Sequence, residues 1–416
     1  MADMVLKLDP EVIVGTDTVT RAGTLCARKG HRALLVTDPL LNESKTITRL
    51  SRILEDAGLE AIQFDEIPGQ ATADAAENAA YIAKGARCDM VIGCGGLKTQ
   101  YTARLISVLA ASSLSLFDML DGGMEEGAFI PYAAIPTTGG DPFLFSDQII
   151  AVDPRDRSVK LVKCPRGLCS TVILDSSLLE PLSIHFASAA VLDGLCTSLE
   201  AYCSTKSSFF SDAVLEQAIA LYAQMIHSYA ETSSDRAGGS LPVIGAASMI
   251  NQVSDITAAQ LHAGFLLSLG ASASTPGIGT ALAYAINGKF PVAKFSCSAV
   301  LLPHVMEKLT TARPEKMAKA AALINASEAG ISGDSAAKTS GALLENATVA
   351  ETANMGVDII RRRMGQLQIP ARLKDFNLSL DRLVPASEAA KNLEFVAFSP
   401  WTVTAEDSYD LLKQAF

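Results

Sequence analysis

Apolar and polar positions along the first 180 residues predict strands that alternate with helices. Apolar residues recur at helical spacing in KTITRLSRILEDAG (residues 45–58) and TADAAENAAYIAKGA (72–86). Between such stretches lie short apolar runs that end in turn residues, which is typical of strands. These runs are RALLVTDPLL (32–41), GLEAIQFDEI (58–67), CDMVIGCGG (88–96), IPYAAIPTT (130–138), DQIIAVDP (147–154), SVKLVKC (158–164) and STVILDSS (170–177). Strand–helix alternation favours a parallel sheet with helices on both faces.

The pattern changes near residue 180. From residue 181 onward the apolar spacing is helical, and almost no strand is predicted. A chain of 416 residues is also too long for one ordinary hydrophobic core. We therefore predict an α/β domain over residues 1–180 and an all-α domain over residues 181–416.

Composition and charge narrow the class of protein. Apolar residues make up 49% of the chain and charged residues 19%, as in a well-buried globular protein. The net charge of −11 argues against a nucleic-acid partner, which would need a basic face. No apolar run approaches the ~20 residues of a membrane span, so no membrane partner is expected. MADMVLKLDP, at the N-terminus, lacks the basic and apolar regions of a signal peptide, which favours a cytoplasmic protein. The eight cysteines include no C-x-x-C pair and are expected to be free thiols.

The segment VIGCGGLKTQYTARLI (91–106) predicts a strand, a glycine turn and the start of a helix. Backbone N–H groups at Gly95 and Gly96, with the helix N-terminus, are suited to a phosphate group, and Lys98 would add positive charge. The alternative is an ordinary strand–helix turn with a solvated lysine.

A second segment, AAIPTTGGDPFLFS (133–146), ends a predicted strand with small and polar residues. Thr137 and Thr138 therefore fall beyond the carboxyl end of a strand, where open α/β sheets bind ligands. A plain surface loop is the alternative.

Two helical segments carry the remaining candidate chemistry. In AVLDGLCTSLEAYCS (190–204), Asp193 and Thr197 are four residues apart and share a helix face. Thr280 and Tyr284 have the same spacing in a helix that is predicted to start after Pro276 and to end at Asn287-Gly288. Lys294 follows in an apolar stretch, where a lysine either extends to solvent or is buried with a partner. The five histidines include no pair four residues apart, so no helical His–His metal pair can form.

Taken in order, these motifs resemble those of the iron-dependent (group III) alcohol dehydrogenases, with maleylacetate reductases and glycerol dehydrogenase as relatives. The resemblance rests on LVTD, IGCGG, AIPTT, ILDSSLLEPL, LDGLCTSLEAYCS and LLPHV, and on the C-terminal tail. It implies a dehydroquinate synthase-like fold with a Rossmann-like dinucleotide-binding domain, a helical domain and an active-site cleft between them. It also implies NAD(P) as cofactor and a homodimer.

Members of that family hold a divalent metal with one aspartate and three histidines, and this sequence departs from the pattern. The aspartate position is Asp193, but the three histidine positions are Thr197, Thr280 and Lys294. A further histidine near the nicotinamide corresponds to Tyr284. One carboxylate and two hydroxyls cannot form an iron or zinc site, so no metal is expected.

The nucleotide motifs depart as well. The family's glycine triplet and serine are replaced by Gly95, Gly96, Leu97 and Lys98, and a leucine side chain there would hinder close approach of a pyrophosphate. The aspartate and lysine of the following helix are replaced by Tyr101 and Arg104.

Two acidic residues bear on the same nucleotide site. In the segment after Thr138, Asp141 is expected to place a negative charge near the phosphate. Asp38 closes LVTD, where a carboxylate can bind a ribose hydroxyl and repel a 2′-phosphate, which favours NAD over NADP.

Three functions fit these residues. The first is a metal-independent NAD(P)-dependent oxidoreductase acting on a small carbonyl or alcohol substrate, in which Lys294 pairs with Asp193 and supplies the positive charge while Tyr284 donates the proton. The second is a lyase or isomerase that holds the carboxylate of a small acid with Lys98, Arg104 or Lys294. The third is a non-catalytic, ligand-binding descendant.

Overall fold

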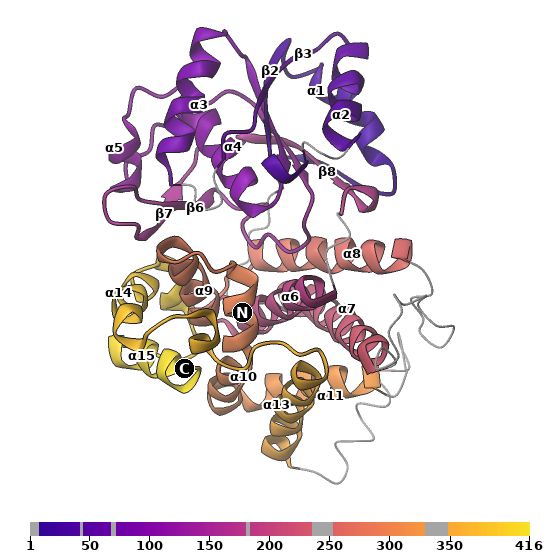
Figure 1. Cartoon of the computed structure of the whole chain (residues 1–416), viewed down its shortest axis with the longest axis vertical. Coiled ribbons are helices and arrows are strands. Elements are labelled where there is room, and N and C mark those ends of the chain that lie inside the picture. Colours follow the sequence, from indigo (N-terminus) through magenta and orange to yellow (C-terminus); the bar gives the residue numbers. More distant parts are fainter. Residues whose placement is uncertain (1–7, 42–44, 68–71, 180–183, 235–252, 329–347) are drawn as a thin grey trace. The chain divides into compact units, whose positions relative to one another are not determined.

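The computed structural model describes residues 8–41, 45–67, 72–179, 184–234, 253–328 and 348–416. The chain divides into two compact units, with the boundary between residues 180 and 181 (Figure 1). Within the described residues, no helix is long and apolar enough to cross a membrane.

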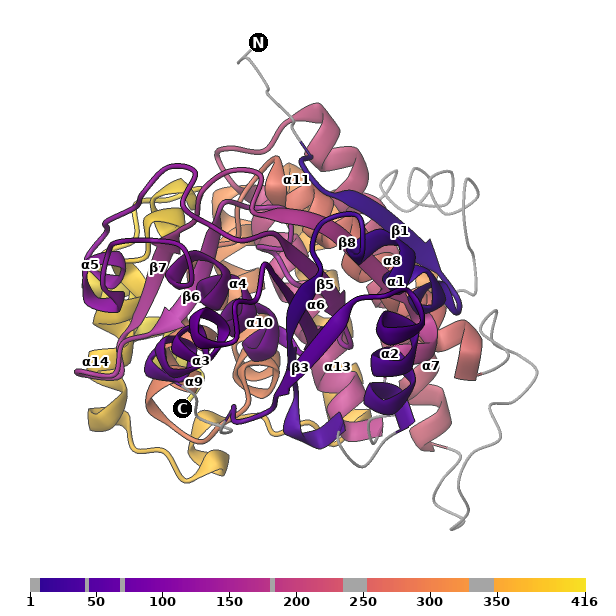
Figure 2. The same ribbon diagram turned by 90° about the horizontal axis from the view of Figure 1, so that it is seen from above.

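The N-terminal unit is built on a parallel sheet of six strands in the order β1-β8-β5-β4-β2-β3. Its strands are β1 (Glu11–Gly15), β2 (Arg32–Thr37), β3 (Glu60–Phe64), β4 (Met90–Gly95), β5 (Tyr132–Pro136) and β8 (Cys169–Asp175). Strands β6 (Gln148–Val152) and β7 (Val159–Lys163) form a separate antiparallel hairpin, on the side of the unit away from β1 in Figure 2. The predicted parallel sheet is confirmed; β1 was not predicted from the sequence.

The central strands are apolar throughout because both faces of the sheet are covered. One face packs against α1 (Ala22–Cys26) and α2 (Lys45–Asp56), and its cluster includes Leu35 and Ile92 of the sheet with Leu50 and Leu54 of α2. Alternate strand residues point to the other side, where α4 (Leu97–Leu109) packs on β4 and β5. The N-terminal unit also contains α3 (Asp74–Gly85) and α5 (Leu116–Leu120).

The strand order reverses between β2 and β4. From β2 the chain moves outward to β3, returns to β4 on the other side of β2, and continues to β5. At such a reversal the connections at the carboxyl ends of the strands diverge and leave room for a ligand. Asp38, Gly96 and Thr137 follow directly after β2, β4 and β5, so this edge carries the nucleotide-site residues predicted from the sequence.

The C-terminal unit is helical, as predicted, and α6 (Ile184–Cys203) is its central helix. It packs against α7 (Phe209–Ser234), α8 (Val253–Ser272), α9 (Ile278–Lys289), α10 (Lys294–Ala312) and α11 (Pro314–Glu328). The unit is completed by α13 (Val349–Gln366), α14 (Leu380–Lys391) and α15 (Ala405–Gln414). Helix α9 runs through Asn287 and Gly288 to Lys289, slightly past its predicted end. Because α6 is buried along most of its length, polar residues on it must find partners within the protein.

Candidate active site

Asp193, Thr197 and Glu200 form a polar stripe on the central helix α6. Their spacing of four and three residues places them on one helix face, and all three are buried. The helices that supply their partners are α9 and α10, which both pack on α6. Five candidate residues predicted from the sequence are thereby brought together in the helical unit: Asp193, Thr197, Thr280, Tyr284 and Lys294.

Lys294, the first residue of α10, forms a buried ion pair with Asp193. Its Nζ lies 2.7 Å from Oδ1 and 2.9 Å from Oδ2 of the carboxylate, and the two side chains are only 7% and 10% exposed. Burial alone would lower the pKa of Lys294, but the facing carboxylate outweighs it and holds that pKa well above its ordinary value. The predicted pair is confirmed, and the alternative in which Lys294 extends to solvent is wrong.

Tyr284 stands beside this ammonium. The Lys294 Nζ lies 4.7 Å from the centroid of the Tyr284 ring, within the range of a cation–π contact. The two hydrogen bonds to Asp193 fix the position of the Lys294 ammonium, and this ammonium contacts the Tyr284 ring.

Thr197 and Thr280 lie within hydrogen-bond distance of each other. Thr197 Oγ1 lies 3.1 Å from Thr280 Oγ1 and 3.0 Å from the carbonyl oxygen of Asp193, and its single proton can be donated to either oxygen. Thr280 Oγ1 donates to Glu200 at 2.6 Å. Both hydroxyls are therefore used in joining α6 to α9.

Glu200 was missed in the sequence analysis, although it lies three residues after Thr197 on the same face. Its carboxylate accepts N–H bonds from Gly277 (3.2 Å), Gly279 (2.6 Å) and Thr280 (3.0 Å), and so caps the N-terminus of α9. A Cβ atom at position 277 would lie 2.9 Å from Glu200 Oε1, so glycine is needed there for this close approach. Burial raises the pKa of Glu200 against the opposing effect of these donors.

These side chains do not fit a divalent metal. The Lys294 ammonium occupies both oxygens of Asp193, and its positive charge would repel a cation. The threonine hydroxyls are neutral and already bonded, whereas iron and zinc sites are built from imidazole, thiolate and carboxylate. In the part of the chain that the structure describes, no group of three or more His, Cys, Asp or Glu is placed to hold a metal ion.

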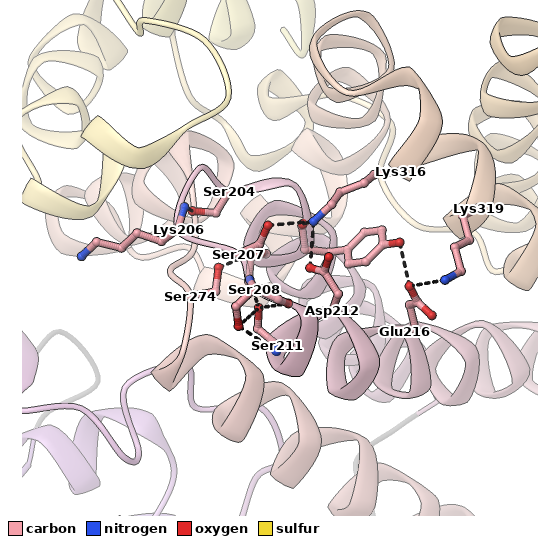
Figure 3. A network of polar contacts seen from close by, with 12 residues as sticks. Ser204, Lys206, Ser207, Ser208, Ser211, Asp212, Glu216, Ser274, Lys316 and Lys319 are labelled. Atoms are coloured by element: carbon pink, nitrogen blue, oxygen red, sulfur yellow. Dashed lines mark hydrogen bonds and ion pairs between the residues drawn. The ribbon is translucent and has the colours of Figure 1, made fainter. Parts of the chain in front are cut away.

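The C-terminal end of α6 is fixed by a separate polar network (Figure 3). Lys316 of α11 donates to the carbonyl of Tyr202, to Ser207 and to Asp212, each at 2.7 Å. Ser274 donates to the carbonyl of Ala201, also at 2.7 Å. Because these donors satisfy carbonyls of the last turn, α6 is held at the end next to Glu200.

The structure also brings together the predicted nucleotide-binding residues of the N-terminal unit. Gly96 is the N-cap of α4, and a Cβ there would lie 3.7 Å from the Thr138 side chain. The N–H of Thr137 donates to the carbonyl of Gly95 at 3.0 Å. The N–H of Asp38 donates to the carbonyl of Cys94 at 3.2 Å, so the backbone at Asp38 lies next to the end of β4. The first turn of α4 and the residues after β2 and β5 thus form one continuous edge.

Leu97 and Lys98 begin α4 and are half-buried. Burial lowers the pKa of Lys98, the positive charge of Arg157 lowers it further, and the carboxylate of Asp38 opposes both. Positive and negative side chains, Lys98 and Asp38, therefore lie close together at the carboxyl end of the sheet.

Asp141 is held by hydrogen bonds within the N-terminal unit. Its side chain is buried, and Oδ1 accepts from the Tyr101 hydroxyl at 2.7 Å and from the N–H of Phe143 at 2.8 Å. Its charge is partly balanced by the buried guanidinium of Arg104. The Asp141 carboxylate therefore binds the protein's own residues, and its nearness to a bound phosphate stays a prediction.

Comparisons with known proteins cover both units. The family described as Iron-containing alcohol dehydrogenase matches residues 9–176, and Fe-containing alcohol dehydrogenase family, C-terminal, matches residues 187–416. The NAD-dependent methanol dehydrogenase of Bacillus methanolicus is 24% identical over 342 residues, which are 81% of this chain and 84% of that protein. A crystal structure of 1,3-propanediol oxidoreductase aligns over 100% of both chains with a TM-score of 0.81 and 22% identity. Sulfoacetaldehyde reductase from Bifidobacterium kashiwanohense, solved with NAD+, aligns over 100% of this chain and 99% of that chain, with a TM-score of 0.77 and 13% identity.

Proposed function

The chain belongs to the iron-containing alcohol dehydrogenase family, and we propose that it is a metal-independent, NAD(P)-dependent member acting on a small, uncharged alcohol or carbonyl compound. The observation that carries the proposal is the buried ion pair of Lys294 with Asp193, because it puts a permanent positive charge at positions that bind the metal in the family. We also propose a homodimer, on the resemblance to the family alone.

In this proposal the Lys294 ammonium polarises the substrate oxygen with its third N–H. Asp193 keeps the ammonium protonated and fixes its direction, so little reorganisation is needed as negative charge develops on that oxygen. Tyr284, beside the ammonium, donates the proton during carbonyl reduction and accepts it during alcohol oxidation. The bound nicotinamide would supply or accept the hydride.

The ion pair also disfavours a lyase or isomerase that grips a substrate carboxylate. Lys294 already directs two hydrogen bonds to the Asp193 carboxylate, so one N–H is left for a substrate oxygen and none for the second oxygen of a substrate carboxylate. Arg104 is buried and gives Nη1 and Nη2 to the carbonyls of Phe143 and Ser146. Two of the three cations considered for that role are thus engaged within the protein.

Metal content tests the proposal directly. Protein purified without a histidine tag and dialysed against EDTA is expected to retain its NADH-dependent reductase activity on small aldehydes, because the positive charge is part of the chain. Elemental analysis should find well under one equivalent of iron or zinc. One tightly held metal per chain, or activity lost with EDTA and restored by Fe²⁺ or Zn²⁺, would overturn the proposal.

Nucleotide preference is a second test. Asp38 follows β2 at the reversal of strand order, where a carboxylate can accept from a ribose hydroxyl and repels a 2′-phosphate. We expect NADH to bind about tenfold or more tightly than NADPH, equal to about 1.4 kcal/mol, in fluorescence titrations at fixed ionic strength. Asp38→Asn should reduce the preference. Tighter binding of NADPH to the wild type would show that Lys98 and Arg157, rather than Asp38, decide the preference.

A further inference from the structure

The segment that follows β5 is fastened to α4 by a buried polar cluster. Asp141 and Tyr101 are 3% and 6% exposed, and their hydrogen bond joins the segment to the helix. The ring of Phe143 meets the ring of Tyr101 edge-on, with centroids 6.4 Å apart. The hydrogen bond and the ring contact act on neighbouring residues of one short segment.

Arg104 adds a second attachment one turn further along α4. Its guanidinium, buried with the residue 3% exposed, donates to the carbonyl of Phe143 at 2.7 Å and to the carbonyl of Ser146. The Phe143 carbonyl also accepts from the N–H of Ser146 at 3.0 Å, so Arg104 binds a turn that the segment has already formed. The segment is therefore attached to the helix at Asp141, Phe143 and Ser146.

Gln100, also on α4, links the ends of the two strands that border the site. Its Nε2 lies within hydrogen-bond distance of the carbonyls of Gly93 (3.1 Å), Gly95 (3.0 Å) and Ile135 (3.2 Å). Its Oε1 accepts from the hydroxyl of Tyr132. The strand ends that lead into Gly96 and Thr137 are thus fixed to one side chain.

Only residues 138–140 lie between the two nearest attachment points, Thr137 and Asp141. Thr137 is bound to Gly95 on one side, and Asp141 is bound to Tyr101 on the other. Gly140 makes the turn with φ of +98°, a region that glycine enters without strain. Thr138, within this short bridge, is held beside Gly96.

We propose that Tyr101 and Asp141 are positioning residues of the dinucleotide site. They hold the backbone at Thr137 and Thr138 in its nucleotide-binding conformation before the nucleotide binds. The inference rests on the proposed function. A binding segment that is already ordered loses little conformational entropy when the nucleotide binds, and this favours affinity. Asp141 acts through the geometry of its Oδ1 atom, which accepts two hydrogen bonds, and not through its charge.

The test compares NADH dissociation constants of the folded wild-type, Tyr101→Phe, Asp141→Asn and Asp141→Ala proteins. Tyr101→Phe removes one hydroxyl and is expected to weaken NADH binding about tenfold, and Asp141→Ala at least as much. Asp141→Asn retains an oxygen that accepts both bonds and should bind within about threefold of wild type. Ser107→Ala is the matched control, because it removes a hydroxyl of α4 that binds Ile130, at the opposite end of β5. It should alter stability but not affinity.

Hydrogen exchange without nucleotide gives an independent readout. The Phe143 amide, which donates to Asp141, should exchange faster in Tyr101→Phe than in wild type, while the Ile150 amide of β6 should not. Unchanged NADH affinity in Tyr101→Phe would overturn the inference alone. Equal tightening in Asp141→Asn and Asp141→Ala would overturn it in favour of simple charge repulsion. A wild-type protein that does not bind NADH would overturn the proposed function and the inference with it.

Discussion

Replacing Lys294 by methionine is expected to lower kcat by about 10²- to 10³-fold, the usual loss when one preorganised donor to a developing oxyanion is removed. Methionine keeps an unbranched stem of similar length, so the main loss is the charge. NADH affinity should stay within about threefold of wild type, because the predicted nucleotide contacts lie on the N-terminal unit. Steady-state kinetics on small aldehydes, together with NADH titration, check both parts.

Lys319→Met is the matched control for this substitution. It removes a lysine of the same helical unit that pairs with Glu216 at 2.7 Å, but this lysine is 57% exposed and lies on α11. We expect wild-type turnover from it. A Lys294→Met protein that is folded and turns over at the wild-type rate would show that the ammonium has no part in the chemistry.

Replacing Asp193 by alanine is expected to reduce the free energy of unfolding by about 3–5 kcal/mol, because it leaves a buried ammonium without its carboxylate. The unpaired lysine should have a lowered pKa, since burial then acts without the opposing Asp193 carboxylate. The folded variant consequently favours neutral lysine, and its deficit should shrink as pH rises from 7 toward the ordinary lysine pKa of about 10.4. Urea unfolding followed by the fluorescence of Trp401, the single tryptophan, measures the change.

A double variant separates stability from activity. Asp193→Leu combined with Lys294→Met replaces the ion pair by apolar side chains and should recover most of the lost stability, as buried pairs often allow. It should not recover turnover. An Asp193→Ala variant as stable as wild type at pH 7 would mean that Lys294 reaches another partner or water, and that the two residues are not energetically coupled.

Much of the fold could be predicted because local patterns agree with it. The apolar runs at β2, β4 and β5 end in turn residues, and the helical spacing of α2 and α3 separates the strands. Strand β1 was missed because Glu11–Gly15 is a short edge strand, only partly buried and paired with β8, which lies far along the chain. Long-range pairing of this kind leaves little local signal.

The candidate site was only partly predictable. Asp193 and Lys294 are 101 residues apart in sequence, and their pairing could be predicted only because the family resemblance implies that both positions belong to one site. Glu200 was missed because its partners are backbone N–H groups, which carry no residue-specific signal. The hydrogen bond of Asp141 could not be predicted because its partner, Tyr101, lies on another element. From the sequence, Tyr101 and Asp141 are two separate departures from the family pattern, whereas in the structure they form one hydrogen bond.

The ion pair of Asp193 on α6 with Lys294 on α10 affects how the active site is completed after synthesis of the chain. A site that depends on a bound ion is completed only after the ion is acquired, and it can be emptied by chelators or damaged when ferrous iron meets dioxygen. Here both Asp193 oxygens are occupied by an amine of the same chain, so this pairing is complete when folding is complete. Under the proposed function, cells starved of iron should yield protein with the same specific activity as iron-replete cells.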